Sequence, residues 1–194
     1  MVRIILVRPG ATDFDAQGRI QGTLNIPLNE AGTAEAAQLA DQLRPVAIEA
    51  VYCAPCEPAL ETGNQIAATA GQKLRRLDQL RNLDHGLWQG MRIDEVRQKF
   101  PTAYRQWQDH PERVCPPEGE MLDAARLRVH EAMRKLLKKH REGTLVLVVP
   151  EPLASLVRSE LVQSELGDLW QAGCKHGCWE AIEVVPEKLV LSGK

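Results

Sequence analysis

The sequence has no apolar run that approaches the roughly 20 residues of a membrane-spanning helix. It also has no excess of positive charge, because 24 Lys and Arg stand against 26 Asp and Glu, a net charge of -2 with His neutral. This balance argues against a nucleic-acid partner. Charge appears too early in residues 1–8 for a secretory signal peptide. The five cysteines are an odd number, which suits reduced thiols. These absences predict a cytoplasmic protein that binds neither membranes nor nucleic acids.

What is present is typical of a globular protein. The chain has 194 residues, of which 44% are hydrophobic and 26% charged. That length suffices for one domain with a sizeable core. No repeat, linker or low-complexity segment divides it, so we expect a single domain over residues 1–194.

Apolar runs alternate with segments of helical periodicity along the chain. The runs at 4–7 and 144–149 are uninterrupted, which is typical of parallel strands buried on both faces. Strands are also expected at 47–53, 77–83 (or an extended run), 178–185 and 189–191, the last two as a closing hairpin. Helices are expected at 30–44, from about 57 to 70, at 92–110 as one or two short helices, at 120–140 and at 153–166. This order predicts an α/β protein, a three-layer α/β/α sandwich with a mostly parallel sheet.

The first buried strand ends in Arg8-Pro9-Gly10-Ala11-Thr12. This stretch resembles the start of the histidine phosphatase superfamily, the phosphoglycerate mutase-like proteins, whose first strand ends in Arg-His-Gly-x-Thr. Residues 80–90 resemble the family pattern Leu-x-Glu-x-x-x-Gly-x-Trp-Glu-Gly, and residues 116–120 match Pro-Pro-x-Gly-Glu. The resemblance covers nearly the whole chain and agrees with the predicted fold. It also implies that residues 83–120 form a lid-like insertion beside the ligand crevice.

The chain departs from the family at the positions that carry the chemistry. The resemblance implies that Pro9 replaces the nucleophilic His, and a proline has no nucleophilic atom. It likewise implies that Pro58 replaces an Arg that grips the phosphate, and that Asn82 replaces the Glu that donates a proton. Glu151 stands in place of the second His, so only Arg8 keeps its family identity among these five.

The surrounding crevice pattern is retained, including a loop at 18–28 that borders the substrate in the family. We therefore predict a ligand pocket without a metal ion or cofactor. Its predicted residues are Arg8, Gly10, Thr12, Arg19, Gln21, Asn25, Asn82 and Glu151. We further expect the Glu151 carboxylate to lie where the phosphate would, near a helix N-terminus, and to pair with Arg8.

These observations predict a catalytically inactive protein with a histidine phosphatase fold and a binding, regulatory or scaffold role. Its ligand or protein partner is not identified by the sequence, and a homodimer is possible. The alternative is a phosphomonoester phosphatase or phosphoglycerate mutase-like enzyme with rearranged catalytic residues. His85 is the nearest candidate for a substitute nucleophile, although its place in the lid-like insertion favours a structural or exposed side chain.

A third and weaker hypothesis is a zinc site. Cys53 and Cys56 have the Cys-x-x-Cys spacing, and residues 174–178 contribute Cys174, His176 and Cys178. The predicted closing hairpin need not lie near residue 53, so buried free thiols remain the simpler expectation.

Overall fold

The structure is a computed structural model that describes residues 1–173 and 175–186. The strands are β1 (Val2–Arg8), β2 (Ala50–Cys53), β3 (Leu74–Arg76), β4 (Gly143–Val148) and β5 (Cys178–Val184). The α-helices are α1 (Asp13–Ala16), α2 (Glu30–Leu43), α3 (Glu57–Thr69), α4 (Ile93–Lys99), α5 (Pro101–Asp109), α6 (Leu122–Lys139), α7 (Leu153–Val162) and α8 (Leu169–Ala172). Short 3-10 helices span Asp78–Leu80, Gly86–Trp88 and Pro111–Arg113.

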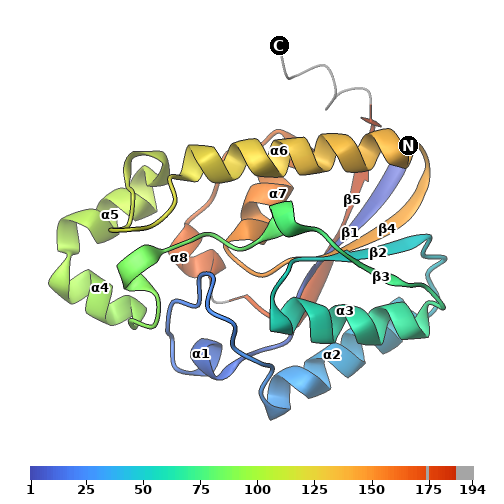
Figure 1. Ribbon diagram of the computed structural model, residues 1–194, viewed down its shortest axis with the longest axis horizontal. Coiled ribbons are helices and arrows are strands. Elements are labelled where there is room, and N and C mark those ends of the chain that lie inside the picture. The colour runs from blue at the N-terminus through green and yellow to red at the C-terminus, as the bar shows by residue number, and fades with distance from the viewer. Residues whose placement is uncertain (174, 187–194) are drawn as a thin grey trace.

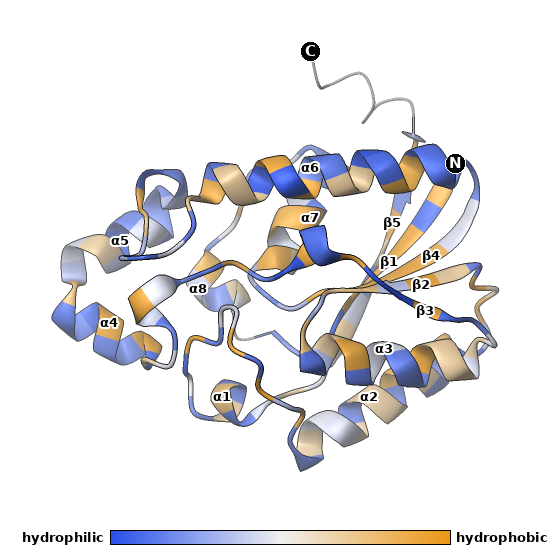
Figure 2. Ribbon diagram, in the orientation of Figure 1, coloured by the Kyte–Doolittle hydropathy of each residue, from blue (hydrophilic) through white to orange (hydrophobic). Residues whose placement is uncertain are grey.

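The five strands form one sheet in the order β3-β2-β4-β1-β5. All neighbouring pairs are parallel except β5, which runs antiparallel to β1. Helices α2 and α3 lie on one side of the sheet, and α6 and α7 on the other (Figure 1). Apolar residues line the central strands (Figure 2), because helices cover both of their faces. The predicted three-layer sandwich is confirmed.

The register of β1 and β4 explains where the ligand crevice forms. Val7 lies opposite Val148, and the Val149 N–H donates to the carbonyl of Val7. The two strands therefore leave the sheet side by side at the same edge. Pro9 and Glu151 follow directly, which places them next to each other.

The turn after β1 passes very close to α2. A Cβ atom on Gly10 would lie 2.1 Å from the carbonyl oxygen of Gly32, so only glycine fits there. The Gly10 N–H donates to Thr62 Oγ1 at 3.1 Å, and the Ala11 N–H to Glu35 Oε2 at 2.9 Å. These contacts fix the turn against α2 and α3.

Three expectations for secondary structure need correction or limits. The strand expected at 77–83 is wrong: β3 ends at Arg76 because its partner β2 ends at Cys53, opposite that residue. Helix α7 ends at Val162 and not at 166, because Gln163 adopts a left-handed backbone (φ 55°) that terminates the helix. The expected strand at 189–191 lies outside the described residues, and β5 pairs with β1.

The segment 83–120 contains two short helices, α4 and α5, at the end of the molecule away from β3 (Figure 1). Helix α5 packs against α8, where the Tyr104 and Trp170 rings stack with centroids 5.1 Å apart. The two helices confirm one of the forms expected for 92–110. The lid role of 83–120 stays a prediction. Among the described residues, no helix is both long and apolar enough to cross a membrane.

Candidate functional site

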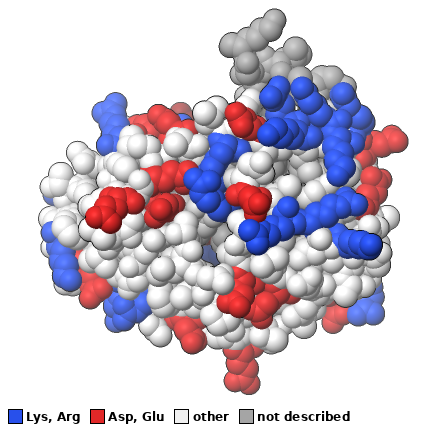
Figure 3. Space-filling model, viewed as in Figure 1, with Lys and Arg blue, Asp and Glu red and all other residues white. Residues whose placement is uncertain are grey.

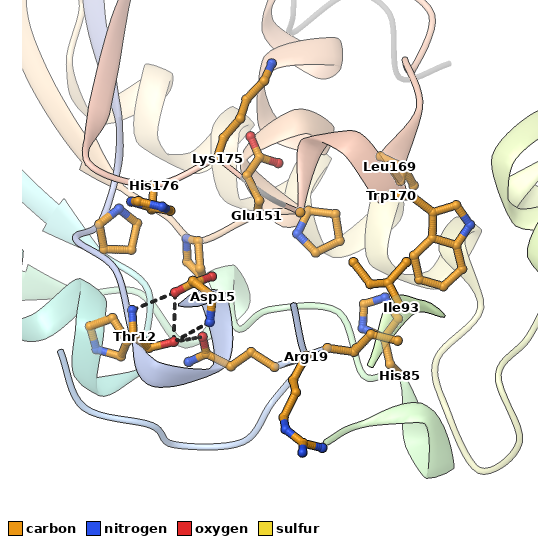
Figure 4. A pocket seen from close by; sticks show the side chains of 18 of the residues that line it. Thr12, Asp15, Arg19, His85, Ile93, Glu151, Leu169, Trp170, Lys175 and His176 are labelled. Carbon is orange, nitrogen blue, oxygen red and sulfur yellow. Dashed lines mark hydrogen bonds between the residues drawn. The ribbon is translucent and has the colours of Figure 1, made fainter. Parts of the chain in front are cut away.

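A cavity of about 60 Å³ opens at the carboxyl ends of β1 and β4 (Figure 4). Its walls come from the turn after β1, the loop at 18–28, the segment after β4, the lid-like insertion and α8. Of the predicted pocket residues, these line it: Gly10, Thr12, Arg19, Gln21 and Glu151. Arg8, Asn25 and Asn82 are not among its lining residues.

Arg8 does not line this cavity and instead borders a separate hollow beside α7, together with Ser155 and Glu180. Its side chain is 6% exposed; Nε donates to Glu151 Oε1 at 2.8 Å, and Nη1 to Glu180 Oε1 at 2.6 Å. Burial alone would lower the pKa of Arg8, but the two carboxylates leave it raised. The predicted pairing of Arg8 with Glu151 is confirmed.

Glu151 has both carboxylate oxygens occupied. Besides the bond to Arg8, its Oε2 accepts from the backbone N–H of Ser155 at 3.1 Å and from the Ser155 hydroxyl at 2.8 Å. Ser155 lies in the first turn of α7, so the carboxylate sits at a helix N-terminus as expected. The side chain is 1% exposed. The protein thus places an anion of its own between Arg8 and this helix.

Asn25 and Asn82 do not line the cavity because their side chains are hydrogen-bonded to the backbone of neighbouring segments. Asn82 Nδ2 donates to the carbonyl of Glu151, and its Oδ1 accepts from the Leu83 N–H, both at 2.9 Å. Asn25 Oδ1 accepts from the Glu57 N–H at 2.9 Å, in the first turn of α3. It takes over the capping role that the N-cap residue Cys56 does not fill with its own side chain.

Two prolines form part of the cavity wall. Pro9 and Pro58 both line it. Pro58 is in the first turn of α3, the only helical position where it is well tolerated. Neither ring offers a hydrogen-bond donor or a nucleophile to the cavity.

His85 is buried, which agrees with the structural alternative of the expectation and not with the exposed one, and it also lines the cavity. Its Nδ1 lies 3.2 Å from the carbonyl of Leu83, and its ring packs against Trp107 with centroids 5.4 Å apart. Burial lowers the pKa of His85 to about 4, so the imidazole is neutral near pH 7. His85 precedes Gly86 inside the family motif, and this position was the one sequence signal that it could line the cavity.

The buried imidazole makes the free energy of unfolding depend on pH. Between about pH 6.5 and pH 4 the unfolded chain binds a proton that folded His85 does not, so stability falls as the pH is lowered through this window. The full effect is about 3 kcal/mol. We expect His85→Gln to remove this part of the slope, measured by urea denaturation from pH 7 to pH 4. An unchanged slope in the variant would show that His85 titrates normally.

Sequence reasoning missed three charged or polar residues of the cavity: Asp15, Lys175 and His176. Asp15 Oδ2 accepts from both the backbone N–H and the hydroxyl of Thr12, each at 2.7 Å. His176 Nδ1 lies 2.9 Å from Glu35 Oε2. Asp15 and Lys175 lie outside the family motifs, and the sequence offers His176 only as a zinc ligand; the chain brings the three together only on folding. Asp15, Glu151 and Lys175 thus give the cavity charges of both signs (Figure 4).

The cysteines do not gather into a recognisable metal centre in the part of the chain that is described. No group of three or more His, Cys, Asp or Glu there is placed to hold a metal ion, and Cys174 lies outside the described residues. Burial raises the pKa of Cys53 to about 12 and that of Cys56 to about 11. Both therefore carry protonated thiols at neutral pH.

The fold and the position of the crevice define an α/β protein of the phosphoglycerate mutase-like class. The profile of the histidine phosphatase superfamily (branch 1) matches residues 4–193. This chain therefore belongs to the histidine phosphatase superfamily.

Several similar proteins are phosphatases by name. Phosphoserine phosphatase 1 of Hydrogenobacter thermophilus is 29% identical over 191 residues, covering 98% of this chain and 90% of that protein. The adenosylcobalamin/alpha-ribazole phosphatase of Salmonella typhimurium is 25% identical over 183 residues, covering 94% of this chain and 91% of that protein. A mycobacterial glucosyl-3-phosphoglycerate phosphatase in complex with VO3 shares the fold with a TM-score of 0.82 at 21% identity, covering 93% of this chain and 90% of that chain.

Proposed function

We propose that this protein is a non-catalytic member of the superfamily that acts through binding rather than phosphoryl transfer. The observation that carries this proposal is that the Arg8 side chain is already paired with carboxylates of the protein itself. Its guanidinium is held by Glu151 and Glu180 and does not line the cavity. By the resemblance, Arg8 is the one chemical residue that the chain retains.

Phosphoryl transfer through histidine needs a nucleophile, a proton donor and fixed positive charge on the phosphoryl oxygens. Pro9 supplies no nucleophile, and the Asn82 amide has no acidic proton and is already hydrogen-bonded. Loss of one member of a cooperating catalytic unit costs about 10⁴- to 10⁶-fold in rate. Loss of the nucleophile alone would therefore bring hydrolysis by the family mechanism below detection.

The charge on the site also works against a phosphate ligand. Two charges 4 Å apart interact by about 4 kcal/mol at an effective dielectric near 20. Arg8 and Glu151 form an ion pair with no net charge, so Arg8 offers no free positive charge to a phosphate, and a phosphate placed directly against the Glu151 carboxylate would be repelled. The positive charge left in the cavity wall comes from Arg19 and Lys175, and neither stands at a position to which the resemblance gives a phosphate-binding role.

A hydrolysis assay tests this function. The wild-type protein is expected to give no rate above background with p-nitrophenyl phosphate or phosphoserine between pH 4 and pH 9, because the nucleophile position is a proline. It should also form no acid-labile phosphohistidine. The Hydrogenobacter phosphoserine phosphatase, assayed in parallel, serves as positive control. Saturable hydrolysis that persists through successive purification steps would contradict the proposal.

A second candidate, a phosphatase with rearranged residues, draws its support from His85. This side chain lines the cavity, and its imidazole is neutral near pH 7, the form in which a histidine attacks phosphorus. The candidate predicts a phosphohistidine at His85 and a rate abolished by His85→Gln. The hydrolysis assay described above, carried out on the wild-type protein and on His85→Gln, separates the two functions.

A further inference from the structure

A second hollow lies far from the crevice, between α6 and the strand β3 at the edge of the sheet. Tyr52 and Leu77 line one side of it, and Ala132, Leu136 and neighbouring residues of α6 line the other. Its volume is about 140 Å³. The floor is therefore mostly apolar and offers room for one side chain.

Positive charge surrounds this groove. Lys135 and Lys139, one helical turn apart on α6, line it directly. On the sheet side, Arg75 lies opposite Tyr52 in the ladder and donates to the Tyr52 hydroxyl at 3.3 Å. Figure 3 shows Lys and Arg side chains gathered over the C-terminal half of α6 and over β3. No ion pair joins Lys135, Lys139 or Arg75 to any other residue in the described part of the chain.

The behaviour of His140 agrees with a positive local field. Its Nε2 lies 2.8 Å from the Tyr52 hydroxyl. Burial, followed by the charges of Lys139 and Arg75, lowers the pKa of His140, and only Glu49 opposes them. The groove therefore holds uncompensated positive charge beside an apolar floor.

We propose that this groove docks an extended acidic segment of a protein partner. An apolar side chain of the segment enters between Leu77 and Leu136. Carboxylates on either side of it pair with Lys135 and Lys139 on the helix and with Arg75 on the sheet. The proposal concerns a surface distinct from the crevice and does not depend on whether the crevice is catalytic.

Two features favour a peptide over nucleic acid. The apolar floor suits a Leu or Phe side chain, and the groove is too short for the long track of phosphate contacts that gives nucleic acids their affinity.

Arginine on an edge strand also discourages strand-to-strand aggregation, which would explain Arg75 alone. Lys135 and Lys139 lie on a helix, where that explanation does not apply.

The test is fluorescence anisotropy with a labelled peptide, Asp-Glu-Leu-Phe-Glu-Asp, at low ionic strength. We expect saturable binding by the wild-type protein that weakens as salt is added. The double variant Lys135→Glu with Lys139→Glu should bind at least about tenfold more weakly, because two attractions become repulsions. A matched double variant, Lys99→Glu with Arg105→Glu, changes the same charge on the exposed surface of α4 and α5 and should bind like wild type.

Three results would overturn the proposal. The first is no binding of the peptide at low salt. The second is an equal loss of binding in both double variants, which would indicate a general charge effect. The third is tighter binding of a single-stranded oligonucleotide of the same charge than of the peptide. Circular dichroism and thermal melting of both variants establish that they fold.

Discussion

Replacing Arg8 by methionine should lower the free energy of unfolding by about 3–5 kcal/mol, because it leaves a buried carboxylate without its partner. The Glu151 side chain is 1% exposed and could not recover its hydration. For a chain of this size the midpoint of thermal unfolding should fall by about 10 °C. Guanidinium denaturation followed by circular dichroism at pH 7 measures the difference.

The same strand supplies a matched control. Arg3 also pairs with a glutamate of β5, at 3.7 Å from Glu183, but the side chains are 44% and 54% exposed. Arg3→Met should therefore change stability by less than about 1 kcal/mol. Adding Glu151→Gln to Arg8→Met should recover part of the loss, because the unpaired charge is removed. A loss in Arg8→Met no larger than in Arg3→Met would show that the buried pair does not stabilise the fold.

Introducing the four residues that the family resemblance implies should create phosphatase activity. The variant combines Pro9→His, Pro58→Arg, Asn82→Glu and Glu151→His, which removes the internal anion and supplies the nucleophile, the second arginine and the proton donor. Hydrolysis of p-nitrophenyl phosphate is expected to rise at least about 10⁴-fold above the wild-type protein, the converse of what losing such a unit costs. The product of a phosphoryl donor assay should be phosphohistidine at position 9.

The control for this experiment keeps three of the four changes and leaves Pro9 in place. It should fold and bind phosphate, because Pro58→Arg adds a cation to the cavity wall and Glu151→His removes the carboxylate, but it should not hydrolyse the ester. An inactive fourfold variant that folds and binds phosphate would show that the crevice has lost its catalytic geometry as well as its residues. Hydrolysis by the three-change control would point to another nucleophile, with His85 the first to examine.

Much of the fold could be predicted because it follows from local patterns. The apolar runs of β1 and β4 are typical of buried strands, and Asn29, a residue type common at helix N-caps, accepts from the Gly32 N–H at the start of α2. The errors occur where a neighbour sets the boundary. Strand β3 ends where β2 ends, and this boundary cannot be predicted from residues 74–83 because it depends on the length of β2.

In the candidate site, too, some features could be predicted from the sequence and others depend on tertiary contacts. Pro9 lacks a nucleophilic atom in any conformation, so that absence was readable from the chain. The pairing of Arg8 with Glu151 was also predictable, since Arg8 ends β1 and Glu151 follows the adjacent parallel strand β4. Glu180 was not: it reaches Arg8 only because β5 runs antiparallel beside β1, which brings the two side chains to the same face on a diagonal.

The sequence by itself determined which atoms are present at the crevice and which strands lead to it, because residue identity and hydrophobic periodicity are local properties. Only the tertiary structure decided that Arg8 lies outside the cavity wall and is held by two carboxylates. It also decided that His85 lies buried against that cavity and that Lys135 and Lys139 of α6 line a groove beside Tyr52, whose hydroxyl accepts from Arg75. These are contacts between segments far apart in the chain, and they exist only once the sheet has formed.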